Sequence, residues 1–146
     1  MLAIGTLPGR AIIVASWAGN LVFASTAVPA ALGVESFDAP AVVAALALFF
    51  VSLLVWTWAF VVALGRSARG DDIVVGNWFG TIGGAARPVR WHLFGSVGVC
   101  LVITVATAAA DPFGVLVPML PIGFVGLWAA RHGTFPPRRA PVPRRV

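Results

Sequence analysis

Long apolar runs dominate the chain and predict four membrane-spanning helices. Four segments contain no acidic, basic or histidine residue: 11–32, 41–64, 93–110 and 113–130. About 20 apolar residues cross the roughly 30 Å core of a bilayer as a helix, so runs of 18 to 24 residues suffice. The period-two alternation typical of a membrane β-barrel is absent, and backbone groups in lipid must pair within their own segment. We therefore predict an all-α integral membrane protein, a bundle of four transmembrane helices.

Composition supports the membrane class. Hydrophobic residues make up 60% and charged residues 10% of the 146 positions, whereas soluble domains have about 45–50% and about 25%. A single cysteine excludes an internal disulfide and a cysteine-based metal cluster. Arginine is present without lysine, and alanine, glycine, valine and proline are abundant. This composition favours GC-rich coding and a bacterial source.

The charges predict the orientation. All ten cationic residues are arginines on one side of the four spans: Arg10, Arg66, Arg69, Arg87, Arg90, Arg131, Arg138, Arg139, Arg144 and Arg145. The opposite side has Glu35, Asp38 and Asp111 and no cation. By the positive-inside rule, both termini and the central loop lie in the cytoplasm of a bacterium, with the spans in its inner membrane. The net charge of +5 is therefore an orientation signal, and we expect no nucleic-acid partner.

The chain divides into a transmembrane domain, residues 1–133, and a basic, proline-rich cytoplasmic tail, residues 134–146. Proline density in the tail predicts an extended arm. Its arginines are predicted to adhere to anionic lipid headgroups, with docking of a partner as the alternative: Arg138, Arg139, Arg144 and Arg145.

The central loop, residues 65–92, is unusually apolar and predicts a short interfacial helix. Asp72 is the expected N-cap, and the glycines at 83 and 84 end the helix. Four apolar residues then share one face: Val75, Trp78, Phe79 and Ile82. We expect this face to lie in the lipid interface, with partner docking through Trp78 and Phe79 as the alternative. The neighbouring Asp71 and Asp72 are expected to form salt bridges or caps rather than a metal site, because adjacent helical residues do not share a face.

Small and polar residues inside two spans predict close helix packing. They recur at spacings of three or four: Ser16, Gly19 and Asn20 in the first span, and Ser96, Cys100 and Thr104 in the third. Small residues let membrane helices approach closely, and hydroxyl and amide groups bond across them. Asn20 is the most polar of these side chains, and a solute contact is its alternative role.

Glycines and prolines interrupt the fourth span, and Pro118 and Pro121 stand inside it. Such interruptions mark binding sites in some transporters, but a simple bend is the preferred interpretation. On the opposite side, Asp38 before Pro40 and Asp111 before Pro112 are predicted to be helix N-caps.

No catalytic chemistry is apparent in the sequence. The spans contain no ionisable residue, which argues against ion-coupled transport, and there is no phosphate loop, zinc motif or nucleophile triad. We therefore expect a non-enzymatic protein with no cofactor or metal, an accessory or scaffold subunit of a larger membrane complex. The alternative is a small homo-oligomeric transporter or channel for an uncharged or hydrophobic solute. The expected partners are lipids and either another membrane protein or a second copy of the chain.

Four stretches resemble small four-span membrane proteins of actinobacterial type. They are Arg69-Gly-Asp-Asp, Ala86-Arg-Pro-Val-Arg, Gly114-Val-Leu-Val-Pro-Met-Leu and Leu127-Trp-Ala-Ala-Arg-His-Gly-Thr-Phe-Pro-Pro-Arg. The resemblance covers roughly residues 69–138. It implies a cell-envelope setting and no particular activity.

Overall fold

The structure is a computed structural model that describes residues 6–138, apart from the side chains of residues 81 and 83. Within this range the regular elements are all helical, and one isolated β-bridge joins two extended segments. Four helical stretches are long and apolar enough to cross a membrane: Arg10–Ala31, Glu35–Ala68, Arg87–Thr107 and Pro112–His132. The prediction of an all-helical chain with four potential spans is thus confirmed.

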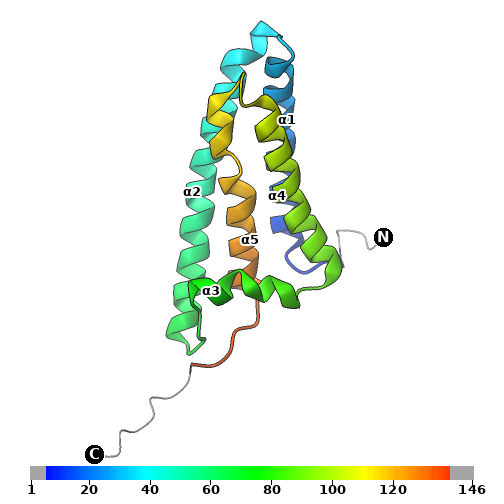
Figure 1. Cartoon of the computed structure of the whole chain (residues 1–146). Coiled ribbons are helices and arrows are strands. Elements are labelled where there is room, and N and C mark those ends of the chain that lie inside the picture. Colours follow the sequence, from blue (N-terminus) through cyan, green and yellow to red (C-terminus); the bar gives the residue numbers. More distant parts are fainter. Residues whose placement is uncertain (1–5, 139–146) are drawn as a thin grey trace, which may run out of the picture.

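The first two long helices form a hairpin. Helix α1, Arg10–Ala31, leads through the 3-10 turn η2, Glu35–Phe37, into α2, Asp38–Ala68 (Figure 1). At 1.5 Å per residue the 31 residues of α2 extend over about 46 Å, well beyond a hydrocarbon core of about 30 Å. Asp38 is the first residue of α2 and forms no capping bond, so its predicted N-cap role is wrong. A carboxylate in this first turn still interacts favourably with the helix dipole.

Helix α4, Arg87–Thr107, begins six residues before the predicted run at 93 and ends three residues before 110. Pro88 stands in its first turn, where proline loses no helical hydrogen bond. The hydrophobic run therefore located the span but not the start of the helix, which includes two arginines.

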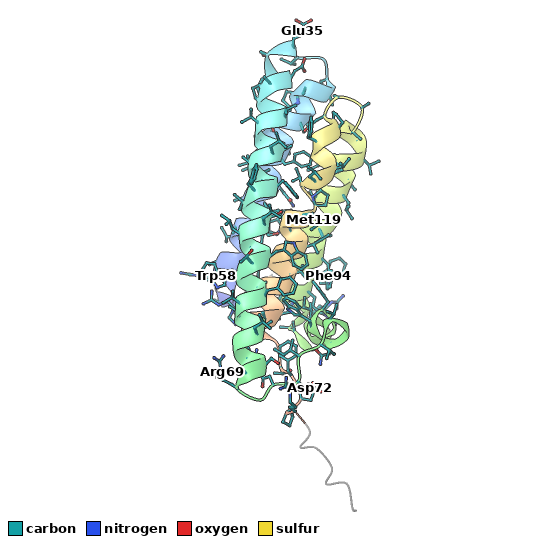
Figure 2. All side chains as sticks on the ribbon, turned by 90° about the vertical axis from the view of Figure 1, so that its left-hand side faces the viewer. Glu35, Trp58, Arg69, Asp72, Phe94 and Met119 are labelled. Carbon is teal, nitrogen blue, oxygen red and sulfur yellow. The ribbon has the colours of Figure 1, made fainter. Side chains whose placement is uncertain are left out.

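The fourth span is divided. The 3-10 segment η4, Pro112–Leu116, precedes helix α5, Met119–His132, and Pro118 is the N-cap residue of α5. Trp56 of α2 donates a hydrogen bond from Nε1 to the Met119 carbonyl oxygen, 3.0 Å away. Met119 lies near the middle of the helices (Figure 2). At the predicted interruption the fourth span therefore changes from a 3-10 helix to an α-helix, and Trp56 of α2 bonds the first residue of that α-helix.

Helix α5 is the central helix. It packs against α1, α2 and α4, most extensively against α2 (Figure 1). Its span is 72% buried, whereas the other three are 28–39% buried. Glycines permit this approach, because a Cβ at Gly19 would lie 2.7 Å from Leu120 Cδ2, and one at Gly123 would lie 3.1 Å from the Trp56 ring. The outward sides of α1, α2 and α4 remain apolar and exposed.

The start of α1 and the end of α5 lie at the same end of the helices. Trp128 near the end of α5 donates from Nε1 to the Pro8 carbonyl, 2.9 Å away. We call this end, which carries the described arginines, the arginine-rich end. Arg69 marks it in Figure 2, and Glu35 marks the opposite, acidic end.

The central loop crosses the arginine-rich end as two short helical segments, α3, Val75–Trp78, and η3, Gly80–Gly84 (Figure 1). Trp78 and Ile82 are almost fully buried against the long helices, whereas Val75 is 74% exposed. The prediction that their shared face lies in lipid is therefore wrong. The N-cap residue is Val74 rather than Asp72, and the Val74 N–H donates to Asn77 Oδ1.

Candidate functional site

A buried polar cluster joins α1 to α4 inside the spans. The Ser16 and Ser96 hydroxyl oxygens share a 2.6 Å hydrogen bond. Asn20 Nδ2 donates both to the Ser96 carbonyl oxygen at 2.8 Å and to Ser96 Oγ at 3.0 Å. All three residues are at most 4% exposed. We call these residues the α1–α4 polar cluster.

The other three residues predicted for packing lie elsewhere in the interior. Gly19 faces Leu120 of α5. Cys100 is buried in a separate apolar cluster that includes Phe23 and Val117. Thr104 donates from Oγ1 to the Gly114 carbonyl at 3.4 Å. The two stripes of small and polar residues thus pack α1, α4 and the fourth span of the same chain against each other.

The Asn20 amide nitrogen and both serine hydroxyls of the α1–α4 polar cluster form hydrogen bonds within the protein. The Asn20 amide nitrogen has two hydrogen-bond acceptors on Ser96, and each serine hydroxyl has the other as a partner. Interhelical bonds of this kind join membrane helices. This arrangement favours helix packing over a solute contact.

The variant Asn20→Ala is expected to lower the free energy of unfolding by about 0.6–1.7 kcal/mol, the range of interhelical hydrogen bonds in membranes. Stepwise denaturation in mixed detergent micelles, followed by circular dichroism, measures this change. Thr57→Ala is the control, because Thr57 bonds only the Leu53 carbonyl of its own helix. Unchanged stability together with lost solute flux would contradict the packing role.

Asp111 is a site residue that sequence reasoning missed. It is 0% exposed at the acidic end, and neither carboxylate oxygen has a hydrogen-bond partner within the described part of the chain. A Cβ on Gly114 would lie 3.3 Å from Asp111 Oδ2 and 3.0 Å from the Phe23 ring, so the carboxylate lies in a tight, largely apolar setting. Asp111 occupies the predicted N-cap position of η4, with Pro112 in the first turn, but its side chain makes no capping bond.

Replacing Asp111 with asparagine is expected to raise the free energy of unfolding by about 1–3 kcal/mol, because the amide keeps the shape of the side chain and removes a charge, and an unpaired buried charge is more unfavourable than an unpaired buried polar group. The same detergent titration measures the gain. Asp38→Asn is the matched control, since Asp38 is exposed at the same end. If Asp111→Asn instead destabilised the protein, the prediction would be wrong, and the Asp111 carboxylate would have a stabilising partner in the native protein.

Arg66 organises the arginine-rich end. Its Nε is 2.6 Å from Asp71 Oδ2, and its Nη1 donates to the carbonyl oxygens of Ala130 at 3.1 Å and Gly133 at 2.8 Å. The guanidinium also lies 4.9 Å from the centre of the Phe135 ring. A cation at these carbonyls complements the negative end of the α5 dipole. Asp71 therefore forms the salt bridge expected from the sequence.

The start of the tail is fixed to the central loop. Asp71 and Pro137 form an antiparallel bridge, and the Asp72 N–H donates to the Pro136 carbonyl at 2.8 Å. Arg138 donates from its backbone N–H to Gly70 and from Nη2 to Ser67 Oγ at 2.7 Å. The other tail arginines predicted to dock lipid or a partner lie outside the described residues: Arg139, Arg144 and Arg145.

Aromatic side chains hold the central loop to the long helices. Trp78 donates from Nε1 to the Gly126 carbonyl of α5 at 2.9 Å, and its ring meets the Phe60 ring of α2 edge to face at 4.9 Å. Phe79 stacks on Trp78 and approaches the Trp56 ring at 6.0 Å. Trp78 is therefore an internal anchor, and Phe79 remains partly exposed.

No group of three metal-ligating His, Cys, Asp or Glu side chains occurs within the described residues. Comparisons with protein-family models, curated proteins and solved structures each found no match to the chain. Function must therefore be inferred from the arrangement of these residues.

Proposed function

We propose that the chain is a non-enzymatic accessory or scaffold subunit of a larger complex in the cytoplasmic membrane of a bacterium. In this proposal all four apolar helices cross the bilayer, and the arginine-rich end with both termini faces the cytoplasm, as the positive-inside rule requires. The partner is another membrane protein.

The hydrogen bonding within the α1–α4 polar cluster carries this proposal. A solute site inside the spans needs polar atoms free to bind the solute, but the donors of Asn20 and the hydroxyls of Ser16 and Ser96 bond each other and the backbone. The small-residue stripes are likewise occupied by packing within the chain. What the helices offer to other molecules is the exposed apolar outer surface of α1, α2 and α4.

The arginines at the cytoplasmic end supply the second part of the proposal. Arg138 is attached to Ser67 and Gly70, so the tail leaves the helices beside the end of α2. Arg139, Arg144 and Arg145 follow it and would bind acidic groups of the partner or anionic headgroups.

A small transporter is the second proposal, and Asp111 is the observation that favours it. An unpartnered carboxylate beside the divided fourth span is the kind of group that binds a solute within a membrane protein. In that proposal the chain works as a homo-oligomer, and Asp111 rather than Asn20 contacts the solute.

Purification of the full chain in mild detergent, with mass determination of the intact complex, tests the two proposals. The scaffold proposal predicts a stoichiometric complex with a larger membrane protein. Replacing Arg139, Arg144 and Arg145 with glutamine should reduce the yield of that complex, whereas Arg69→Gln should not.

A complex containing only copies of this chain would contradict the scaffold proposal. If Asp111→Asn then abolished solute flux in proteoliposomes while the oligomer persisted, the transporter proposal would replace it.

A further inference from the structure

An amphipathic groove lies between the start of α4 and the loop segment at the arginine-rich end. Its volume is about 760 Å³, and Phe79 and Gly80 form one side of it. The remaining lining residues come from α4: Arg87, Arg90, Trp91, Phe94 and Gly95. We propose that this groove binds one anionic phospholipid of the cytoplasmic leaflet, with the phosphate at the two arginines.

The groove changes from charged to apolar along α4. Its five α4 positions follow the spacing of three, four, seven and eight residues that defines one face of a helix. At 1.5 Å per residue, about 12 Å separate the level of Arg87 from that of Gly95. The arginines therefore lie at the end of the helix, and Phe94 and Gly95 lie two turns deeper. A phospholipid has the same order of groups, from its phosphate to its acyl chains.

The two arginines at the charged end of the groove are suited to binding an anion. The Arg87 side chain makes no ion pair or hydrogen bond within residues 6–138, where the one salt bridge joins Arg66 to Asp71. Arg90 stands one turn further on the same face. Guanidinium groups bind phosphate oxygens in a bidentate manner. Arg87 and Arg90 both line the groove from one helical face, so they place two positive charges at the same end of it.

Aromatic groups define the apolar part. Trp91 is 68% exposed and Phe94 is 52% exposed, and Figure 2 shows Phe94 at the outer edge of the helices. Tryptophan prefers the headgroup level of a bilayer. Phe79 is fixed by its stacking on Trp78, so the loop side of the groove is preformed.

The size and position of the groove favour a lipid over free phosphate. Pockets of about 300–1,000 Å³ accommodate organic molecules of drug size, much larger than one phosphate ion. The apolar half continues into the exposed surface of α4 at Val99 and Val102, where acyl chains would lie. The inference rests on the membrane orientation in the proposed function and not on the scaffold role.

Native mass spectrometry of the full chain tests the inference, with phosphatidylglycerol and phosphatidylcholine of identical acyl chains as probes. We expect one phosphatidylglycerol to bind preferentially. If each arginine contributes about 1 kcal/mol, the variant Arg87→Gln/Arg90→Gln weakens its binding about 30-fold in total. The charge control is Arg69→Gln, because Arg69 is exposed and does not line the groove, whereas Arg66 makes contacts that stabilise the fold. This control should leave the affinity for phosphatidylglycerol unchanged.

A second variant fills the groove without changing charge. A Cβ at Gly95 would make only an ordinary van der Waals contact, 3.9 Å from Trp17 Cζ2, so the backbone there admits a side chain. Because Gly95 lines the groove, the longer side chain of Gly95→Leu should block the acyl part. This variant decides the question if the double arginine variant fails to fold. Unchanged phosphatidylglycerol binding by Gly95→Leu, equal binding of phosphatidylcholine, or an equal loss in Arg69→Gln would overturn the inference. Displacement of the lipid by equimolar inorganic phosphate would also overturn it.

Discussion

The variant Trp78→Ala is expected to lower the free energy of unfolding by about 3–5 kcal/mol, as do large-to-small substitutions of buried aromatic residues. Trp78 is 3% exposed, bonds the Gly126 carbonyl and packs against Phe60. Its removal leaves a void between the loop, α2 and α5, and it also removes the hydrogen bond from Trp78 Nε1 to the Gly126 carbonyl. Detergent denaturation measures the loss, and trypsin cleavage at the loop arginines should become faster.

Trp91→Ala is the matched control for this prediction. Trp91 is 68% exposed on α4, so its loss should change stability by no more than about 0.5 kcal/mol. If the two tryptophan variants were equally stable, or if loop cleavage were unchanged in Trp78→Ala, the loop would not be anchored to the helices as described.

Arg66→Gln is expected to have the second largest effect, a loss of about 1.5–3 kcal/mol, the range for hydrogen bonds to charged groups. The guanidinium bonds Asp71 and the carbonyls of Ala130 and Gly133, and the Arg66 side chain is only 20% exposed. Without it, α5 loses a cation at its C-terminus. Residues 134–138 should also lose amide-exchange protection, because Arg66 helps to hold the adjoining loop in place.

The control for Arg66 is Arg69→Gln, one turn further along the chain and exposed. It removes the same charge without removing the carbonyl contacts, so it should leave both stability and amide exchange unchanged. Equal effects of the two variants would mean that general electrostatics, not the specific contacts of Arg66, stabilise this end.

The four long helices were predictable because charge-free runs of this length have one stable form in lipid. The central position of α5 was not predictable from apolarity, which all four runs share. The useful signal was glycine placement, since Gly19 and Gly123 stand where α5 approaches its neighbours. The sequence placed small and polar residues on packing faces, but it could not specify whether they would meet helices of the same chain or of a partner.

The surroundings of the central loop and of Asp111 could not be predicted from the sequence. An amphipathic face packs equally well on lipid or on protein, so the pattern around Trp78 predicted a buried face without identifying what would bury it. Asp111 before Pro112 has the local pattern of a helix cap, but its burial depends on Phe23 and Gly114, which only the tertiary packing brings to it. The groove was not predicted because it forms only where the loop segment with Phe79 and Gly80 lies beside the start of α4.

Topology mapping in cells tests the central claim most directly, namely that four spans carry the arginine-rich end and both termini on the cytoplasmic side. Reporters that distinguish the two sides of the membrane are fused before Met1 and after Val146, and a third is inserted at Ser36 in the turn before α2. The account predicts cytoplasmic signals from both termini and an external signal from Ser36. Termini on opposite sides of the membrane, or a cytoplasmic Ser36, would contradict it.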